Sequence, residues 1–296
     1  TAEDNTPIKL RNNKFTQLFE SLTGMYGWPN YGEFDPTPIL APFFLLFFAM
    51  CMGDCGYGIL LIIIGLLIAK KKLNIAMFEG LGPIITVLGV GTTVVGFFLG
   101  TFMGIDLYNA EWMPQALKSV MIKGEVMGYD IQMVLALCIG VFHICLAMVV
   151  KAICYTKQFG FKENIATWGW LLLIVGGLIV AILGLTVLPE NVFKWALIAV
   201  GAVSALAIYI FNTPGRNPLI NIGAGLWDTY NMATGILGDV LSYIRLYAFG
   251  LAGGMLGAAF NNLGLMVMGG TTEGATWQWL PFVLILVLGH VLNLAM

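Results

Sequence analysis

The sequence predicts an all-α integral membrane protein with about eight transmembrane helical segments, the first two forming a short hairpin and the last two long and tilted. Of its 296 residues, 59% are hydrophobic and only 10% are charged, and its mean hydropathy is +0.88. Soluble domains are about 45–50% apolar and about 25% charged. The formal net charge of −2 is near neutral and does not indicate nucleic-acid binding, so we expect no nucleic-acid partner.

The first apolar stretch, residues 38–69, is best divided into two helices. As one helix it would be about 48 Å long at about 1.5 Å per residue, whereas the hydrocarbon core of a bilayer is about 30 Å thick. Its midpoint holds CMGDCGYG, whose glycines and aspartate favour a tight turn. We therefore expect helices over about 38–53 and 57–69. The other apolar stretches lie near 82–104, 131–154, 166–187, 191–212, 218–268 and 279–296.

The distribution of basic residues supports this division. If residues 1–37 are cytoplasmic, the split places these basic residues inside, as the positive-inside rule requires: Lys70, Lys71, Lys72, Lys151, Lys157, Lys162 and Arg216. The loop 105–130 and the connection that holds Glu273 then lie outside. A single long first helix would reverse the side of every later loop.

Residues 1–37 are mixed and polar, and they predict the end of a soluble or interfacial region that leads into the membrane. The chain begins with Thr1 and shows no signal-peptide pattern, so we expect a fragment of a longer protein. The five cysteines lie in apolar runs, which favours buried free thiols over disulfides.

The stretch 218–268 is too long for a perpendicular crossing. Its beginning carries an apolar stripe at helical spacing from Leu219 to Leu237, with polar residues between. We expect an amphipathic section at the cytoplasmic interface that runs into a tilted spanning helix over about 233–268.

Arg245, in the middle of that helix, is the strongest functional signal in the sequence. A charge at the centre of a bilayer costs about 2.5–3.5 kcal/mol even on insertion scales. Asp239 lies six residues away, about 120° round the helix, so the two are not an i,i+4 ion pair. The side chain is also poorly placed to snorkel, because a full apolar stretch follows it. The alternative is an arginine with a purely structural role. A role of Arg245 in the function of the protein is favoured over it.

The helix face around Arg245 consists mostly of small residues. The positions within about 60° of it are Thr234, Gly238, Leu241, Ser242, Ala248, Phe249, Ala252, Leu256 and Ala259. Small residues let another helix approach closely in lipid. The face therefore fits a partner helix that carries a carboxylate, and it equally fits a static helix–helix contact.

Other polar residues in the apolar segments leave two interpretations open. Asp54 either stabilises the turn between the first two helices or belongs to an ion path. Asp239, together with Asp228 and Asn231 near the interface, either lines a water-filled access path or has a structural role. A hydrogen-bonded core histidine is favoured over a proton relay for His143, and likewise for His290, which lies one helical turn from Asn293.

The sequence holds no nucleotide-binding G-x-x-x-x-G-K-[ST] loop, no metal-ligand spacing and no nucleophile elbow. We therefore expect no cofactor, no metal and no bond-making chemistry in this chain.

Three motifs carry a family resemblance. GILGDVLSYIRLYAFGLAGG resembles the arginine-bearing helix of the membrane subunit of V/A-type rotary ATPases, called subunit I in bacteria and archaea and subunit a in eukaryotes. DPTPILAPFFLLFFAMCMGDCGYGILL is similar to the opening hairpin of that family, and PIKLRNNKFTQLFESLTGMYGWPNYGEFDPTP to its linker from the cytoplasmic domain. The residues around the arginine favour subunit I.

The resemblance implies a non-catalytic stator subunit in a bacterial or archaeal plasma membrane. Residues 1–37 would be the linker and residues 38–296 the ion-translocating domain. Two ion half-channels would open against a rotating ring of small membrane subunits, with Arg245 displacing H⁺ or Na⁺ from the ring carboxylates. The candidate half-channel residues are Asp239, Ser242, Asn231, Asp228, Asp54 and His290.

The resemblance also implies peripheral-stalk and central-rotor partners, which contact an N-terminal cytoplasmic arm that precedes such a linker. We expect that arm to be missing and the last helix to be truncated at Met296, before the family's second arginine. Two alternatives belong to other classes: a self-contained secondary transporter with an Asp/Arg site, and a scaffold without an ion path. Inverted repeats would favour the transporter, and the sequence shows no convincing one.

Overall fold

The computed structural model describes residues 10–29, 34–70, 80–187, 189–212, 217–269 and 276–295. Helices, most of them apolar, make up most of this part of the chain, which confirms the all-α membrane class. Among the described residues, six helical spans are long and apolar enough to cross a membrane: Gly82–Leu99, Ile131–Phe159, Lys162–Thr186, Glu190–Ile210, Leu219–Val267 and Thr276–Ala295. The helices fall into two compact units, one made of residues 1–137 and 243–296, the other of residues 138–242.

The predicted break in the first apolar stretch is confirmed. Helix α2 (Thr37–Met52) ends at Gly53, whose φ of 56° is left-handed, and α3 (Cys55–Ala69) begins after Asp54. Glycine adopts positive φ at no steric cost, and the aspartate accepts hydrogen bonds from the first N–H groups of α3. The turn sequence therefore both stops one helix and starts the next.

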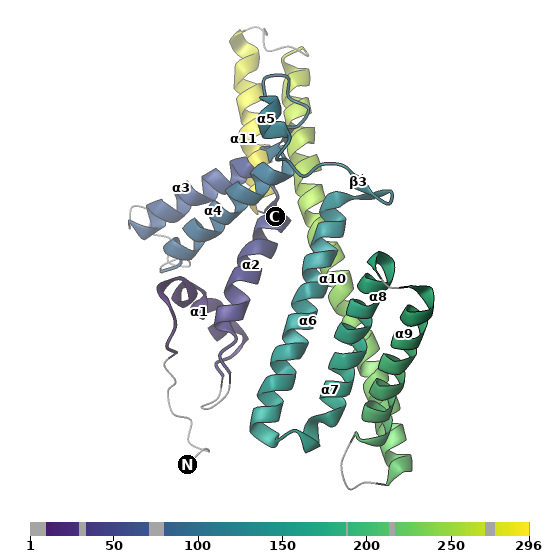
Figure 1. The fold of residues 1–296 in the computed structure, drawn as a ribbon. Coiled ribbons are helices and arrows are strands. Elements are labelled where there is room, and N and C mark those ends of the chain that lie inside the picture. The colour runs from purple at the N-terminus through teal and green to yellow at the C-terminus, as the bar shows by residue number, and fades with distance from the viewer. Residues whose placement is uncertain are drawn as a thin grey trace. The chain divides into compact units, whose positions relative to one another are not determined.

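The prediction that the first two membrane helices pack as a hairpin is wrong: α3 instead forms a tight antiparallel pair with α4 (Gly82–Leu99), visible in Figure 1. Glycines on both helices bring the backbones together. A Cβ on Gly58 would lie 2.4 Å from the backbone nitrogen of Thr93, and one on Gly89 would lie 2.7 Å from that of Ile62. Such small-residue contacts are the usual packing solution between helices in lipid.

One helix in the first unit lies within the predicted polar linker. Helix α1 (Lys14–Tyr26) places Phe19 in a cluster with Ala41 of α2 and Ile84 of α4, and Phe19 is fully buried. The Thr23 hydroxyl lies 2.9 Å from the Thr37 hydroxyl at the start of α2. The linker is therefore packed onto the transmembrane helices at this point.

The expected outer loop is not fully irregular. It contains β1 (Thr101–Phe102) paired with β2 (Ile105–Asp106), the short helix α5 (Gln115–Lys118), and β3 (Glu125–Val126) paired with β4 (Tyr129–Asp130). The predicted span 82–104 ends five residues earlier, because Gly100 adopts a left-handed φ of 70° that closes α4.

Helix α6 (Ile131–Phe159) begins in the first unit and continues into the second. The second unit also contains η2 (Lys162–Asn164), α7 (Ile165–Leu171), η3 (Leu172–Gly176), α8 (Gly177–Thr186), α9 (Glu190–Ala205) and η4 (Leu206–Ile210). Here α8 packs on α9, and η4 packs on α7. Both η3 and η4 are π-helical turns, which are frequent at functional sites.

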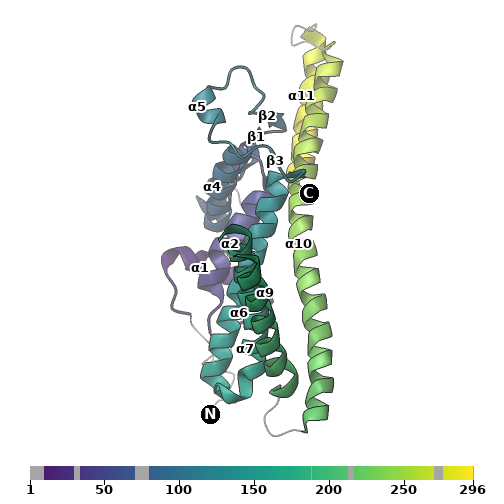
Figure 2. The ribbon, with the colours of Figure 1, turned by 45° about the vertical axis from the view of Figure 1, so that its right-hand side comes forward.

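Helix α10 (Pro218–Val267) is one unbroken helix of 50 residues, so the expected amphipathic section continues directly into the spanning section. After η5 (Thr276–Gln278), α11 (Trp279–Ala295) lies beside the C-terminal part of α10 in Figures 1 and 2. Gly289 of α11 receives the Phe260 ring, and Gly264 of α10 receives the Phe282 ring. Four of the charged residues used to predict topology, Lys71, Lys72, Arg216 and Glu273, lie outside the described residues.

Candidate functional site

Arg245 lies on α10, and its side chain is exposed. Within the first unit, Ala248, Phe249, Ala252 and Ala259 on the same face are also exposed. The helix thus presents a row of mostly small side chains with a cation at one end. This is the geometry that the sequence periodicity predicts for a close-approach face.

In the second unit, Asn231, Asp239 and Ser242 are exposed on α10. The Ser242 hydroxyl donates to the carbonyl of Gly238 at 2.9 Å. Asp239 interacts electrostatically with His143 of α6. The sequence alone did not pair these two residues, since nearly a hundred positions separate them.

Asp228 is half-buried at the beginning of α10, where it accepts a hydrogen bond from the Asn212 side chain at 2.8 Å. Next to it, the hydroxyls of Tyr209 and Thr229 lie 3.0 Å apart. Tyr209 belongs to the π-helical turn η4. A polar cluster therefore lies where α9 ends and α10 begins, and sequence reasoning identified only Asp228 of its members.

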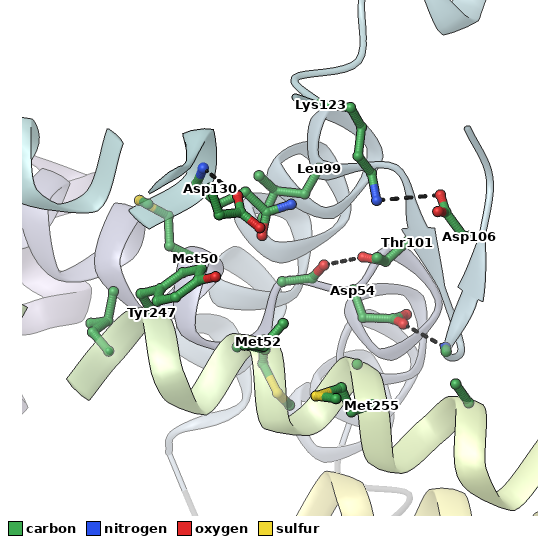
Figure 3. A pocket seen from close by; sticks show the side chains of 18 residues that line it. Met50, Met52, Asp54, Leu99, Thr101, Asp106, Lys123, Asp130, Tyr247 and Met255 are labelled. Carbon is green, nitrogen blue, oxygen red and sulfur yellow. Dashed lines mark hydrogen bonds and ion pairs between the residues drawn. The ribbon is translucent and has the colours of Figure 1, made fainter. Parts of the chain in front are cut away.

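A cavity of about 290 Å³ with charged side chains in a largely apolar lining lies in the first unit, between the turn after α2, the β1–β2 region, the beginning of α6 and α10 (Figure 3). Its α10 wall starts at Leu246 and Tyr247, directly after Arg245. Lys123 and Asp106 form an ion pair of 3.3 Å in its lining, and Asp130 lies near Tyr247. Sequence reasoning placed the charged residues in an outer loop and did not associate them with α10.

Asp54 lines this cavity but has little freedom there, because it is 2% exposed. Its Oδ1 accepts from the N–H groups of Gly56 at 2.8 Å, Tyr57 at 3.2 Å and Met103 at 2.7 Å, and its Oδ2 accepts from Gly104 at 2.9 Å. Four backbone N–H groups therefore fix the position of both carboxylate oxygens. These contacts favour the structural interpretation of Asp54.

His290 of α11 lies between Tyr57 of α3 and Asn261 of α10, and Asn293 contacts the same tyrosine. The structure thus agrees with the interpretation of His290 as a hydrogen-bonded histidine. Among the described residues, no group of three or more His, Cys, Asp or Glu side chains is placed to hold a metal ion.

Comparisons with known proteins agree with these features. Residues 1–112 match the V-type ATPase 116kDa subunit family. The A-type ATP synthase subunit I of Methanocaldococcus jannaschii is 30% identical, over 99% of this chain and 45% of that protein. The A-type ATP synthase subunit I of Pyrococcus abyssi is 30% identical, over 99% of this chain and 42% of that protein. The V-type ATP synthase subunit I 1 of Treponema pallidum is 29% identical, over 99% of this chain and 47% of that protein. The chain spans less than half the length of each of these relatives.

Proposed function

Since the chain belongs to the V/A-type ATPase subunit I family, we propose that it is the membrane domain of the stator in a rotary ATPase. In this role it holds an ion path against a rotating ring of small membrane subunits and performs no bond-making step itself. The ATP-dependent chemistry belongs to other subunits of the complex.

The observation that carries the proposal is the exposed face of α10 with Arg245 on it. A ring helix can approach the small side chains closely. A cation within about 4–6 Å lowers the pKa of a carboxylate, so Arg245 displaces the H⁺ or Na⁺ from a ring carboxylate as it passes. Arginine suits this task because it stays charged when it is desolvated, whereas lysine does not.

Two polar regions supply the candidate half-channels. In the first unit, the cavity with Asp106, Lys123 and Asp130 borders α10 just beyond Arg245, and we assign it to the outer side. In the second unit, Asp228 and Asp239 form a polar series along α10, with Asn231 and Ser242 beside it, and we assign this series to the cytoplasmic side. In the α10 sequence, the second-unit series ends at Ser242 and the cavity lining begins at Leu246, so Arg245 comes between them in the chain.

The domain organisation follows from this assignment. Residues 1–37 form a linker from a cytoplasmic part of the protein, and residues 38–296 form the ion-translocating domain in a bacterial or archaeal plasma membrane. The peripheral-stalk and central-rotor subunits contact the cytoplasmic part.

The test is replacement of Arg245 in the assembled complex. We expect Arg245→Ala to abolish ATP-driven ion pumping in inverted vesicles and Arg245→Lys to leave only a small residual rate. Lys194→Ala is the matched control, because Lys194 is an exposed cation paired with Glu190 at 2.7 Å on α9 and is not among the residues assigned to the path. Normal pumping by an Arg245→Ala complex that assembles fully would rule the proposal out. Ion-coupled transport by the full chain alone in liposomes would support a secondary transporter instead.

A further inference from the structure

We infer that His290 is a positioning residue: as a neutral imidazole protonated at Nε2, it clamps α10 to α3 and α11 and so fixes the face that carries Arg245. The inference rests on the proposed function, and it assigns His290 a role different from lining a half-channel. It follows from a connected set of hydrogen bonds that joins four parts of the first unit.

The hydrogen bonds form a continuous chain. His290 Nδ1 lies 2.7 Å from the Tyr57 hydroxyl, and His290 Nε2 lies 3.1 Å from Asn261 Oδ1. Asn261 Nδ2 donates to the carbonyl of Met103 at 2.8 Å. The N–H of Met103 in turn donates to Asp54, so the chain ends on the carboxylate that starts α3.

Asn293 extends this series of hydrogen bonds beyond Tyr57 and back to α10. Its Nδ2 donates to the Tyr57 hydroxyl and to the carbonyl of Gly253, both at 2.8 Å. Tyr57 is 2% exposed and Asn293 is 8% exposed. Leaving such buried polar groups unpaired is costly, so the hydrogen bonds fix the relative positions of these side chains.

One protonation pattern gives every donor and acceptor in this network a partner. Asn261 uses its amide nitrogen on Met103, so its oxygen must accept a hydrogen from His290 Nε2. The Tyr57 oxygen already accepts from Asn293, so its hydrogen is directed to His290 Nδ1. A proton on Nδ1 would leave the Tyr57 hydroxyl hydrogen without this acceptor in a buried site. His290 is therefore a fixed donor and acceptor, which is the opposite of what a proton carrier requires.

The clamp acts on α10 at two levels. His290 and Asn293 of α11 form hydrogen bonds with Asn261 and Gly253 of α10, respectively. Gly253 lies eight residues, or about 12 Å, from Arg245 along the helix. Because the helix is continuous between them, the rotation and depth set at these contacts are transmitted to Arg245.

Two substitutions at His290 distinguish a positioning role from a role in proton transfer. Glutamine keeps one donor and one acceptor and does not titrate, whereas leucine keeps only the approximate volume. In the assembled complex with the full chain, we expect His290→Gln to pump within about threefold of wild type and His290→Leu to lose about tenfold or more, as expected for unpaired buried groups. Disulfide crosslinking from Ala252→Cys to a ring-helix cysteine should be kept in the glutamine variant and lost in the leucine variant. Glutamine as inactive as leucine would overturn the inference.

Further variants exclude a general folding defect. Tyr57→Phe and Asn261→Leu should reduce pumping in the same direction, whereas Asn262→Leu, at the exposed neighbouring position, should not. The double variant Tyr57→Phe with His290→Leu should be no worse than His290→Leu alone, since both break one network. Additive losses would contradict a shared network.

A measurement on the wild-type protein covers the case in which His290→Leu does not assemble. The ¹⁵N spectrum of labelled histidine, assigned by the signal lost in His290→Gln, should show an Nε2-protonated neutral ring at neutral pH. An imidazolium or an Nδ1-protonated ring would overturn the inference. Normal pumping by Arg245→Ala would instead overturn the proposed function, so the two failures are distinct.

Discussion

The carboxylate of Asp54 accepts a hydrogen bond of 2.7 Å from the backbone N–H of Met103, a residue 49 positions further along the chain. Met103 has a φ of 47°, which a non-glycine residue seldom adopts. The bond therefore fastens the start of α3 to a specific conformation of the β1–β2 turn, and this turn lies against α10 through Gly104 and Gly257.

Replacing Asp54 should destabilise this junction strongly. Asp54→Ala leaves four backbone N–H groups without their acceptor, and each unsatisfied buried donor costs about 1–3 kcal/mol. Asp54→Asn keeps the shape of the side chain but replaces one carboxylate oxygen with an NH₂ group, which cannot accept a hydrogen bond from the N–H groups that contact that oxygen. We therefore expect a smaller loss of stability than in Asp54→Ala. Thermal unfolding of the purified protein in lipid nanodiscs measures both. Wild-type stability with lost pumping in Asp54→Asn would show that Asp54 acts in the ion path instead.

Close approach of the β1–β2 turn to α10 should make Gly257 intolerant of a side chain. A Cβ on Gly257 would lie 3.0 Å from the Cα of Gly104, so Gly257→Ala should push the turn away and lower the melting temperature. Gly254→Ala is the control one turn earlier, since a Cβ on Gly254 would meet nothing within 4 Å. In a helix interior alanine is favoured over glycine by about 0.5–1 kcal/mol, so the control should be neutral or stabilising. Equal losses in both variants would contradict the close contact.

The exposed face of α10 should be sensitive to side-chain volume only in the complex. Ala252 is exposed on the Arg245 face, so Ala252→Leu should leave the stability of the chain itself nearly unchanged. If a ring helix packs there, the added volume should reduce pumping by about tenfold, since overpacking costs about 1–3 kcal/mol. Ala233→Leu, also exposed but about 120° from Arg245, should pump normally. Equal pumping by both variants would show that no helix packs closely on the Ala252 face.

The sequence was informative wherever the signal is local. The break at Gly53 and Asp54 follows from turn residues within an overlong apolar stretch, and the Arg245 face follows from helical periodicity. Both features depend on residues within a few turns of each other. Their prediction therefore requires no knowledge of which helices meet.

Contacts between distant segments could not be predicted in this way. Tyr57 and His290 are 233 positions apart, and each is an ordinary residue of an apolar helix. Helix α1 was missed for a related reason: its stability comes from burying Phe19 against α2 and α4, while its sequence is mixed and its neighbours favour turns. Tertiary packing, rather than local propensity, determines these features.

The junction of α1 with α2 should weaken in acid. Burial acts to raise the pKa of Asp35, but hydrogen bonds from the Thr37 hydroxyl at 2.6 Å, the Thr37 N–H at 2.9 Å and the Asn12 amide at 2.8 Å outweigh it and lower the pKa below its ordinary value. A carboxyl whose pKa is lowered by folding contributes stability above its unfolded pKa of about 3.9. This stability is lost as the pH falls through the lower folded value.

Asp35→Asn should therefore lower the melting temperature at pH 7, and the difference from wild type should shrink as the pH falls below about 4. Glu111→Gln is a suitable control, because Glu111 is exposed in the outer loop and should show no such pH-dependent gap. The melting temperatures of the three proteins across this pH range measure the effect. Because Asn12 also donates to Glu20 within α1 at 2.9 Å, a confirmed gap would show that the charge of Asp35 helps to hold the linker helix on the membrane domain. A gap that stays constant with pH would mean that the lost contacts, rather than the lost charge, account for the change in stability.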